Sequence, residues 1–124
     1  MIVKEINGDI LETELNYIAH GVNCQGKMGS GIAKVISERY PEVKEQYLEY
    51  YRNGIRVAIN GHEDFLGSVL SVRTKDGKFI LNCFTQLNYG YDGQLYLSYE
   101  ALKEVFEIMT ENYSKVAIPK IGCG

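Results

Sequence analysis

The chain has 124 residues, a net charge of −3 at pH 7 and a pI of about 5.4. Hydrophobic residues make up 45% of it and charged residues 23%, values typical of a globular protein and not of a disordered one. This length predicts one domain, residues 1–124, with a core that needs no disulfides. The acidic balance argues against binding to a nucleic-acid backbone, which requires a basic surface.

The cysteines, Cys24, Cys83 and Cys123, are widely spaced and form no CxxC pair or Cys/His cluster. This pattern predicts free thiols, with neither a disulfide framework nor a metal site. The N-terminus lacks the basic and apolar segments of a signal peptide, and no apolar run is long enough to cross a membrane. We therefore expect a cytoplasmic protein without a bound cofactor.

Strand-like and helix-like segments alternate along the first half of the chain. Residues 2–6 predict a short strand that ends at the turn Asn7–Gly8, and the apolar run 17–22 predicts a strand buried on both faces. Apolar residues at helical spacing over 32–40 predict a helix. Pro41 suits the first position of a second helix, because proline fits best in the first helical turn.

The second half continues the alternation. Two apolar runs, 66–74 and 79–84, flank an Asp-Gly pair and predict a β-hairpin. Ser98 suits the N-cap of a long amphipathic helix whose apolar stripe extends to Tyr113. Residues 116–118 predict the last strand. Together the segments predict an α/β domain built in layers.

A glycine-rich segment, residues 23–32, connects the second predicted strand to the first predicted helix. Such a loop can hold a phosphate, because glycines let the backbone come close and the first N–H groups of a helix are free to bind an anion. Open α/β sheets also bind ligands at the carboxyl ends of their strands. The pattern is neither a Walker A loop nor GxGxxG, and a connection that only needs positive φ explains it equally well.

Three titratable residues allow a structural and a functional interpretation. By itself, Asp9 is best explained as an exposed turn residue, although its carboxylate would accept a hydrogen bond from the amino group of adenine. His20 lies in the apolar strand that leads into the glycine-rich segment, where a structural and a catalytic histidine are equally plausible. His62 lies in a polar stretch, which predicts a solvated side chain.

Two further segments follow predicted strands. Residues 85–93 mix aromatic, amide and glycine residues, which suits a loop that binds a sugar or a base, although a tyrosine-rich surface loop is the alternative. Residues 119–124 have the composition of a second anion loop, and there the sequence stops. One more helix and strand would add roughly 20 residues. We expect a longer native chain, the alternative being a frayed C-terminus.

Taken in order, the segments GDI (8–10), HGVNCQGKMGSGIAKVI (20–36), FTQLNYG (84–90) and IPKIGCG (118–124) resemble the macro domain family over essentially the whole chain. The resemblance implies a three-layer α/β/α domain with a mixed central sheet, lacking the family's C-terminal helix and strand. It also implies that the chain binds ADP-ribose or a derivative. The branch that it most resembles contains the ADP-ribose 1″-phosphate phosphatases and the terminal ADP-ribose protein glycohydrolase.

The resemblance assigns site residues by position. The residues that would contact adenine are Asp9 and Ile10. The residues that would present backbone amides to the diphosphate are Gly29, Ser30, Gly31 and Ile32, and a second phosphate loop would begin at Gly122, Cys123 and Gly124. The residues that would surround the distal ribose are Asn23 and Gln25 on one side and Gln86, Asn88 and Tyr89 on the other.

The reaction that this resemblance favours is hydrolysis of ADP-ribose 1″-phosphate, with a positioned water, no metal, and His20 as general acid, base or nucleophile. The alternative is a non-catalytic reader of ADP-ribose, free or attached to a protein. Lysine-dependent glycohydrolysis is not expected, because Gln86 stands where the family's glycohydrolase has a lysine and an amide forms no Schiff base. The aspartate of that enzyme lies beyond the IGCG motif, where this chain ends.

Overall fold

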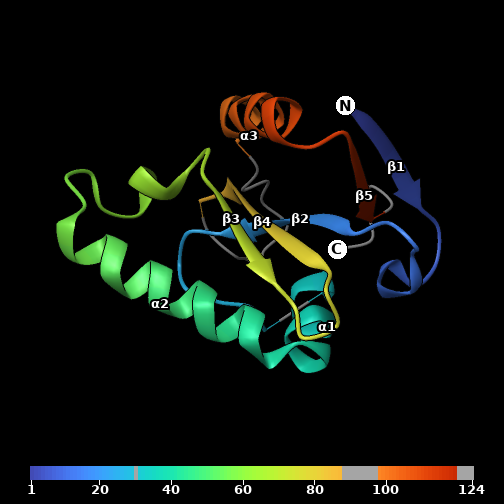
Figure 1. Cartoon of the computed structure of the whole chain (residues 1–124). Coiled ribbons are helices and arrows are strands. Elements are labelled where there is room, and N and C mark those ends of the chain that lie inside the picture. Colours follow the sequence, from blue (N-terminus) through green and yellow to red (C-terminus); the bar gives the residue numbers. More distant parts are fainter. Residues whose placement is uncertain (30, 88–97, 120–124) are drawn as a thin grey trace.

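The computed structural model describes residues 1–29, 31–87 and 98–119. Within these residues a five-stranded sheet lies between helices on both of its faces (Figure 1). The strands are β1 (Ile2–Ile6), β2 (Tyr17–Asn23), β3 (Val69–Arg73), β4 (Phe79–Gln86) and β5 (Lys115–Pro119). The helices are α1 (Gly31–Arg39), α2 (Pro41–Val57) and α3 (Tyr99–Asn112), with the 3-10 helices η1 (Ile10–Glu12) and η2 (Gly61–Phe65).

The sheet is mixed, and its strand order is β1-β5-β2-β4-β3. All neighbours run parallel except β3, which pairs antiparallel with β4 in the predicted hairpin. Gly77 in the hairpin turn has a φ of +86°, which explains the glycine there. β2 pairs with β4 along its whole length but with β5 only at Ile18 and Ala117, so β2 and β5 diverge. The carboxyl ends of β2 and β4 therefore lie together.

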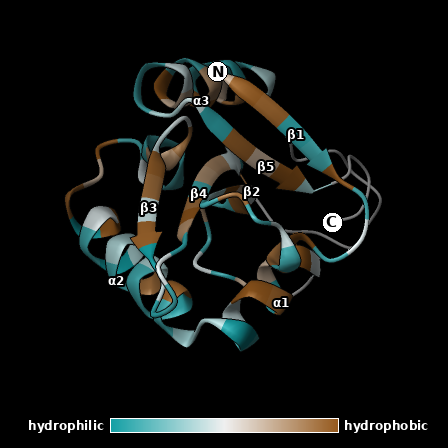
Figure 2. Ribbon diagram, turned by 45° about the vertical axis from the view of Figure 1, so that its right-hand side comes forward, coloured by the Kyte–Doolittle hydropathy of each residue, from teal (hydrophilic) through white to brown (hydrophobic). Residues whose placement is uncertain are grey.

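Side-chain alternation along the strands creates two cores, one on each face of the sheet. Ile18 and Ile80 belong to the core that includes α1 and α2, whereas Ala19 and Leu81 belong to the core beneath α3. Figure 2 shows this arrangement as hydrophobic strand segments enclosed between the helices. The predicted three-layer α/β/α fold with a mixed central sheet is confirmed.

The sequence patterns predicted the helix starts well. Pro41 is the first residue of α2, and the Ser98 Oγ accepts a hydrogen bond from the Ala101 N–H at 3.1 Å, which caps α3. The helices η1 and η2 were not predicted, because three and five residues are too few to show a helical period. The expectation of a truncated C-terminus concerns residues beyond Pro119, which lie outside the described part of the chain.

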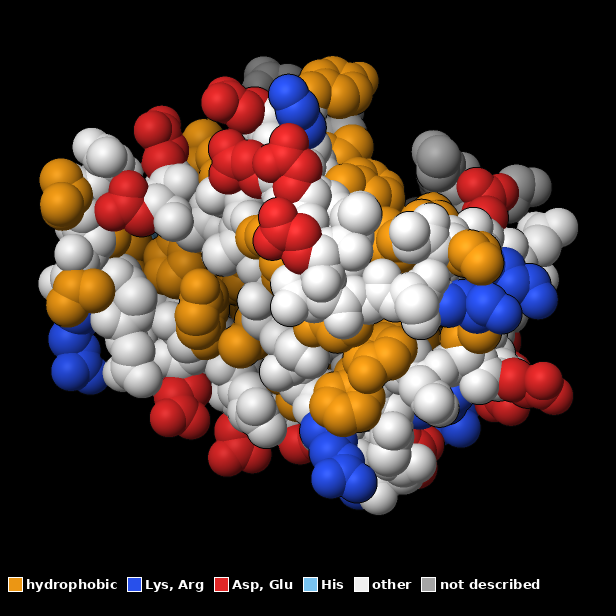
Figure 3. All heavy atoms as spheres, turned by 45° about the horizontal axis from the view of Figure 1, so that its top comes forward, with side chains coloured by type: hydrophobic (Ala, Val, Ile, Leu, Met, Phe, Trp, Pro, Cys, Tyr) orange, Lys and Arg blue, Asp and Glu red, His pale blue; other side chains and the backbone are white. Residues whose placement is uncertain are grey.

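The face of the molecule seen in Figure 3 carries acidic and basic side chains, several of them next to one another, interspersed with hydrophobic side chains. No helix among the described residues is long and apolar enough to span a membrane.

Truncating the central parallel strands should cost far more stability than truncating a surface residue of the same type. Ile80 on β4 is completely buried, and Ile59 is 92% exposed. We expect Ile80→Ala to lower the free energy of unfolding by about 3 kcal/mol and Ile59→Ala by less than about 0.5 kcal/mol. Urea unfolding measures both values. Similar losses in the two variants would contradict the assignment of β4 to the core.

Candidate functional site

The loop that follows β2 is organised by the side chain of Asn23. Its Oδ1 accepts hydrogen bonds from the backbone N–H groups of Gln25 at 2.9 Å and Lys27 at 3.3 Å. Its Nδ2 donates to the Lys27 carbonyl at 2.7 Å. The residue is 7% exposed. Asn23 was expected beside the distal ribose; that contact stays a prediction, and the structure gives the side chain the further role of fixing the loop.

Tyr47 of α2 contacts Asn23 from the helix layer that packs on the sheet. Its hydroxyl lies 2.8 Å from the carbonyl oxygen and 3.0 Å from the Oδ1 of Asn23, and donates to these acceptors. Tyr47 is completely buried. Burial raises the pKa of this phenol above its usual range, so the hydroxyl keeps its proton throughout physiological pH. The loop therefore rests on a donor whose protonation state does not change.

Two more side chains contact the loop from outside. His62 of η2 places its Nδ1 2.8 Å from the carbonyl oxygen of Cys24. Gly26 has a φ of +72°, and a Cβ there would lie 2.9 Å from the ring of Tyr51. The expectation that His62 is only solvated is therefore wrong. Its polar neighbours in sequence suggested exposure, but the contact is made with a residue 38 positions away.

The start of α1 lies where the diphosphate was predicted. Gly29 is exposed and has open space around its Cα, and Gly31 opens the helix with a φ of +58°. Ile32 is half-buried and packs against the core below α1. The first N–H groups of a helix have no partner within it, so this end of α1 is suited to an anion.

The end of β4 is tied to the loop after β2. The Cys24 N–H donates to the carbonyl of Gln86 at 3.0 Å, and the Gln25 Nε2 donates to the carbonyl of Leu87 at 3.2 Å. Gly21 on β2 is exposed, and a Cβ there would lie 3.5 Å from the Gln86 Nε2 and 2.8 Å from the Thr85 Oγ1. The structure thus brings Gln25 and Gln86 together around an accessible stretch of the central strand.

The predicted adenine turn is a helix cap in the structure. Asp9 is exposed, and its Oδ1 accepts a hydrogen bond from the Leu11 N–H at 3.0 Å at the start of η1. Ile10 is 2% exposed and packs in the core. Asp9 therefore retains an exposed carboxylate for a ligand, whereas Ile10 fixes the turn through its buried side chain.

His20 lies on the α1 and α2 face of β2 and is 4% exposed. Its Nε2 forms a hydrogen bond with the Asn82 Oδ1 at 2.7 Å, and its Nδ1 is buried without a partner among the described residues. Burial lowers the pKa of His20 to about 4, against the raising effect of the Asn82 hydrogen bond. The imidazole is therefore neutral at pH 7. Its catalytic role stays a prediction.

The remaining assigned residues, Ser30, Asn88, Tyr89, Gly122, Cys123 and Gly124, lie outside the described residues, and their roles stay predictions. Within the described part of the chain no group of His, Cys, Asp and Glu is arranged to hold a metal ion. Cys24 and Cys83 are buried free thiols, and burial raises the pKa of each to about 12.

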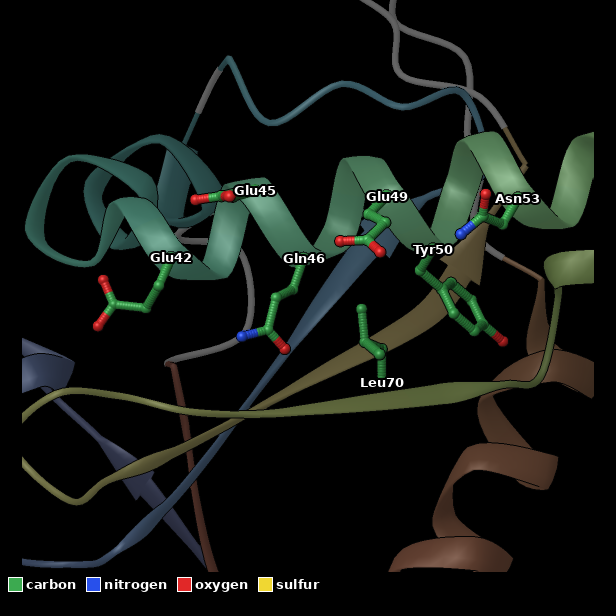
Figure 4. Close-up of a pocket in the computed structure, with 7 residues that line it drawn as sticks. All are labelled: Glu42, Glu45, Gln46, Glu49, Tyr50, Asn53 and Leu70. Atoms are coloured by element: carbon green, nitrogen blue, oxygen red, sulfur yellow. The ribbon is translucent and has the colours of Figure 1, made fainter.

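A groove of about 530 Å³ lies elsewhere, between α2 and the edge strand β3 (Figure 4). Its lining residues are Glu42, Glu45, Gln46, Glu49, Tyr50, Asn53 and Leu70. None of them was assigned to the ligand, and an acidic lining does not suit a diphosphate. The candidate site is therefore the surface around the β2–α1 loop.

No protein-family profile matches the chain. The chain is 30% identical over 122 residues to a DNA ADP-ribosyl glycohydrolase of Mycobacterium tuberculosis. The aligned region covers 95% of this chain but only 32% of that protein. The chain thus spans about a third of that relative's length. It is 28% identical over 141 residues to an ADP-ribose 1″-phosphate phosphatase of Lodderomyces elongisporus, covering all of this chain and 83% of the phosphatase.

Solved structures with the same fold include the macrodomain of Mycobacterium tuberculosis DarG, with a TM-score of 0.72 and 29% identity over 99% of this chain and 78% of that one. Thermosipho africanus DarTG in complex with ADP-ribose has a TM-score of 0.74 and 16% identity, covering 99% of this chain and 34% of that one. At that lower identity the likeness shows the fold alone.

The lowered pKa of His20 makes stability depend on pH. The histidine has a pKa of 6.5 in the unfolded chain and about 4 in the folded one, so the unfolded chain binds more protons between these values. We expect the free energy of unfolding to fall by about 3 kcal/mol as the pH falls through this range. His20→Gln should lack that contribution.

Urea unfolding at several pH values between about 7 and 4 measures the effect, by comparing the parent with His20→Gln. His62→Gln is the matched control, since it removes the only other histidine of the sequence. An equal loss of stability in the parent and in His20→Gln would show that His20 does not titrate as its burial requires.

Proposed function

This chain belongs to the macro domain family, and on that premise we propose that it binds ADP-ribose or a close derivative at the carboxyl ends of β2 and β4. The observation that carries the proposal is the β2–α1 loop, which Asn23 holds in shape directly before the exposed start of α1. Backbone N–H groups at a helix start bind phosphate without a basic side chain, which is compatible with the net charge of −3.

The reaction that we propose is hydrolysis of ADP-ribose 1″-phosphate. Water attacks the phosphorus, the bond between phosphorus and the ribose oxygen breaks, and ADP-ribose and inorganic phosphate leave. The phosphatase of Lodderomyces elongisporus, which is similar over the whole of this chain, supports this choice. Backbone amides would stabilise the charge on the phosphoryl oxygens, and neutral His20 would take up a proton from the attacking water and return it to the departing ribose oxygen.

A non-catalytic reader is the second candidate, and the burial of His20 favours it. A side chain that is 4% exposed and hydrogen-bonded to Asn82 is typical of a structural residue in a protein core. Binding of ADP-ribose without catalysis requires only the β2–α1 loop and the carboxyl ends of β2 and β4. ADP-ribosylated protein would then be the partner, in addition to free ADP-ribose.

Lysine-dependent removal of ADP-ribose is not proposed, although one relative is named a glycohydrolase. Gln86 ends β4 beside Gly21, and its side-chain amide is not a nucleophilic amine.

Asp9 offers a test of binding. We expect Asp9→Ala to weaken the affinity for ADP-ribose by roughly ten- to hundred-fold, because a charge-assisted hydrogen bond to the adenine amino group is lost. Titration calorimetry measures the dissociation constant. Asp9→Asn keeps an oxygen that can cap η1 and so separates recognition from folding, and Glu14→Ala is an exposed acidic control. Affinity that is unchanged in Asp9→Ala would place the adenine elsewhere.

Phosphorus NMR of ADP-ribose 1″-phosphate mixed with the protein decides between enzyme and reader. The phosphatase predicts growth of the inorganic phosphate signal, with turnover at least about tenfold slower in His20→Ala. Shifted or broadened diphosphate signals without phosphate release would identify a reader. Signals that stay the same in position, width and intensity would reject both functions.

A further inference from the structure

Two elements that are distant in sequence from the β2–α1 loop meet it at Cys24 and Gly26. Tyr51 comes from the second half of α2, and His62 comes from η2. Their rings lie 5.9 Å apart between centroids, and Tyr51 also stacks on Phe65 at 5.5 Å. Neither residue was assigned to the ligand, yet both touch the part of the loop that the distal ribose was expected to approach.

The hydrogen bond of His62 has a fixed direction. A carbonyl oxygen only accepts, so the His62 Nδ1, 2.8 Å from the Cys24 oxygen, carries the proton and donates. The Tyr51 hydroxyl is 3.5 Å from the same nitrogen, which is too long for a strong bond. Tyr51 therefore acts through its ring and His62 through its N–H group.

The contact at Cys24 orients a whole peptide unit. Its carbonyl is held by His62, and the N–H on the other side of the same peptide, that of Gln25, is held by the Asn23 Oδ1 at 2.9 Å. Because a peptide unit is planar, the two groups turn together. Without the His62 bond only the Gln25 N–H restrains the peptide, and rotation of the peptide would release that N–H as well.

Tyr51 limits the loop at the next residue. Gly26 has a positive φ, and its Cα lies so close to the Tyr51 ring that a Cβ would be 2.9 Å from it. The ring is thus the surface against which the backbone of Gly26 rests. Asn23 and Tyr47 hold the loop from inside, and Tyr51 and His62 hold it from outside.

We propose that Tyr51 and His62 are positioning residues, which fix the Cys24–Gln25 peptide and the backbone of Gly26 and thereby set the affinity of the loop for the ribose and phosphates of the ligand. The inference rests on the proposed function for its ligand, but not for the shape of the loop. His62 acts through a single N–H donor, so a different side chain with a donor at the same place should replace it.

Hydrogen exchange followed by NMR tests the loop in the free protein. Exchange of the Gln25 and Lys27 amides, both bonded to Asn23, should be about tenfold faster or more in His62→Leu than in the parent. In His62→Gln, whose amide can donate, it should stay within about threefold of the parent. Glu63→Ala is the control, since Glu63 lies on the same 3-10 helix with an exposed side chain.

Tyr51 supplies a second pair of variants, which decides the question if His62→Leu does not fold. Tyr51→Ala removes the ring and should accelerate exchange of the same two amides, whereas Tyr51→Phe keeps the ring and should not. Exchange within about twofold of the parent in the folded His62→Leu or Tyr51→Ala protein would overturn the inference.

Titration with ADP-ribose tests the link to the ligand. Affinity should fall by about tenfold in His62→Leu, should recover to within about threefold of the parent in His62→Gln, and should not change in Glu63→Ala. Accelerated exchange with unchanged affinity would overturn the role in binding. A parent protein that binds no ADP-ribose would contradict the proposed function instead, and the exchange data would still judge the loop.

Discussion

The hydrogen bonds of the Asn23 side chain determine how the central strand becomes a binding loop. β2 and β4 lose their regular pairing between Val22 and Asn23. Strict alternation would place Asn23 opposite to Val22, on the α3 face, whereas Tyr47 of α2 contacts it. An irregularity of this kind re-aims a side chain. One amide then serves the loop backbone on one side and the helix layer on the other.

A second polar pair is built into the interior of the same two strands. His20 and Asn82 are register partners, and the Asn82 Nδ2 also donates to the Leu70 carbonyl on β3 at 3.0 Å. The pair therefore joins the three strands β2, β4 and β3 by side-chain bonds. Buried polar groups are costly unless they are paired, so this arrangement favours one register over the alternatives. The same burial that secures the register makes His20 an unusual catalyst.

The fold could be predicted from the sequence because its signals are local. The Asp-Gly turn, Pro41 and Ser98 each act on the few residues beside them, and the structure has the predicted element at all three places. The glycine-rich segment 23–32 can likewise be recognised from its own composition. What holds that segment could not be predicted, since the partners of Tyr47 and His62 lie 24 and 38 residues away. Helical spacing indicates that Tyr47 is buried, but not which group its hydroxyl meets.

The site was also harder to predict because one residue type serves two purposes. An asparagine beside a loop is equally suited to bind a sugar and to bond its own backbone, and only the positions of the Gln25 and Lys27 amides show the second use. Ile10 is expected to contact adenine together with Asp9; that contact stays a prediction, and the structure places the Ile10 side chain in the core. Adjacent residues of a turn point in different directions, which sequence order does not reveal.

The position of Cys24 affects how the loop withstands oxidants and alkylating reagents. The thiol has no exposed surface, and its pKa of about 12 leaves almost no thiolate at neutral pH. Peroxides and electrophiles attack the thiolate, so Cys24 should not react with them while the β2–α1 loop keeps the conformation described above. Only a molecule whose loop has opened would be modified. The Cys24 thiol in the candidate site is thus unreactive toward these reagents for as long as the loop keeps its conformation.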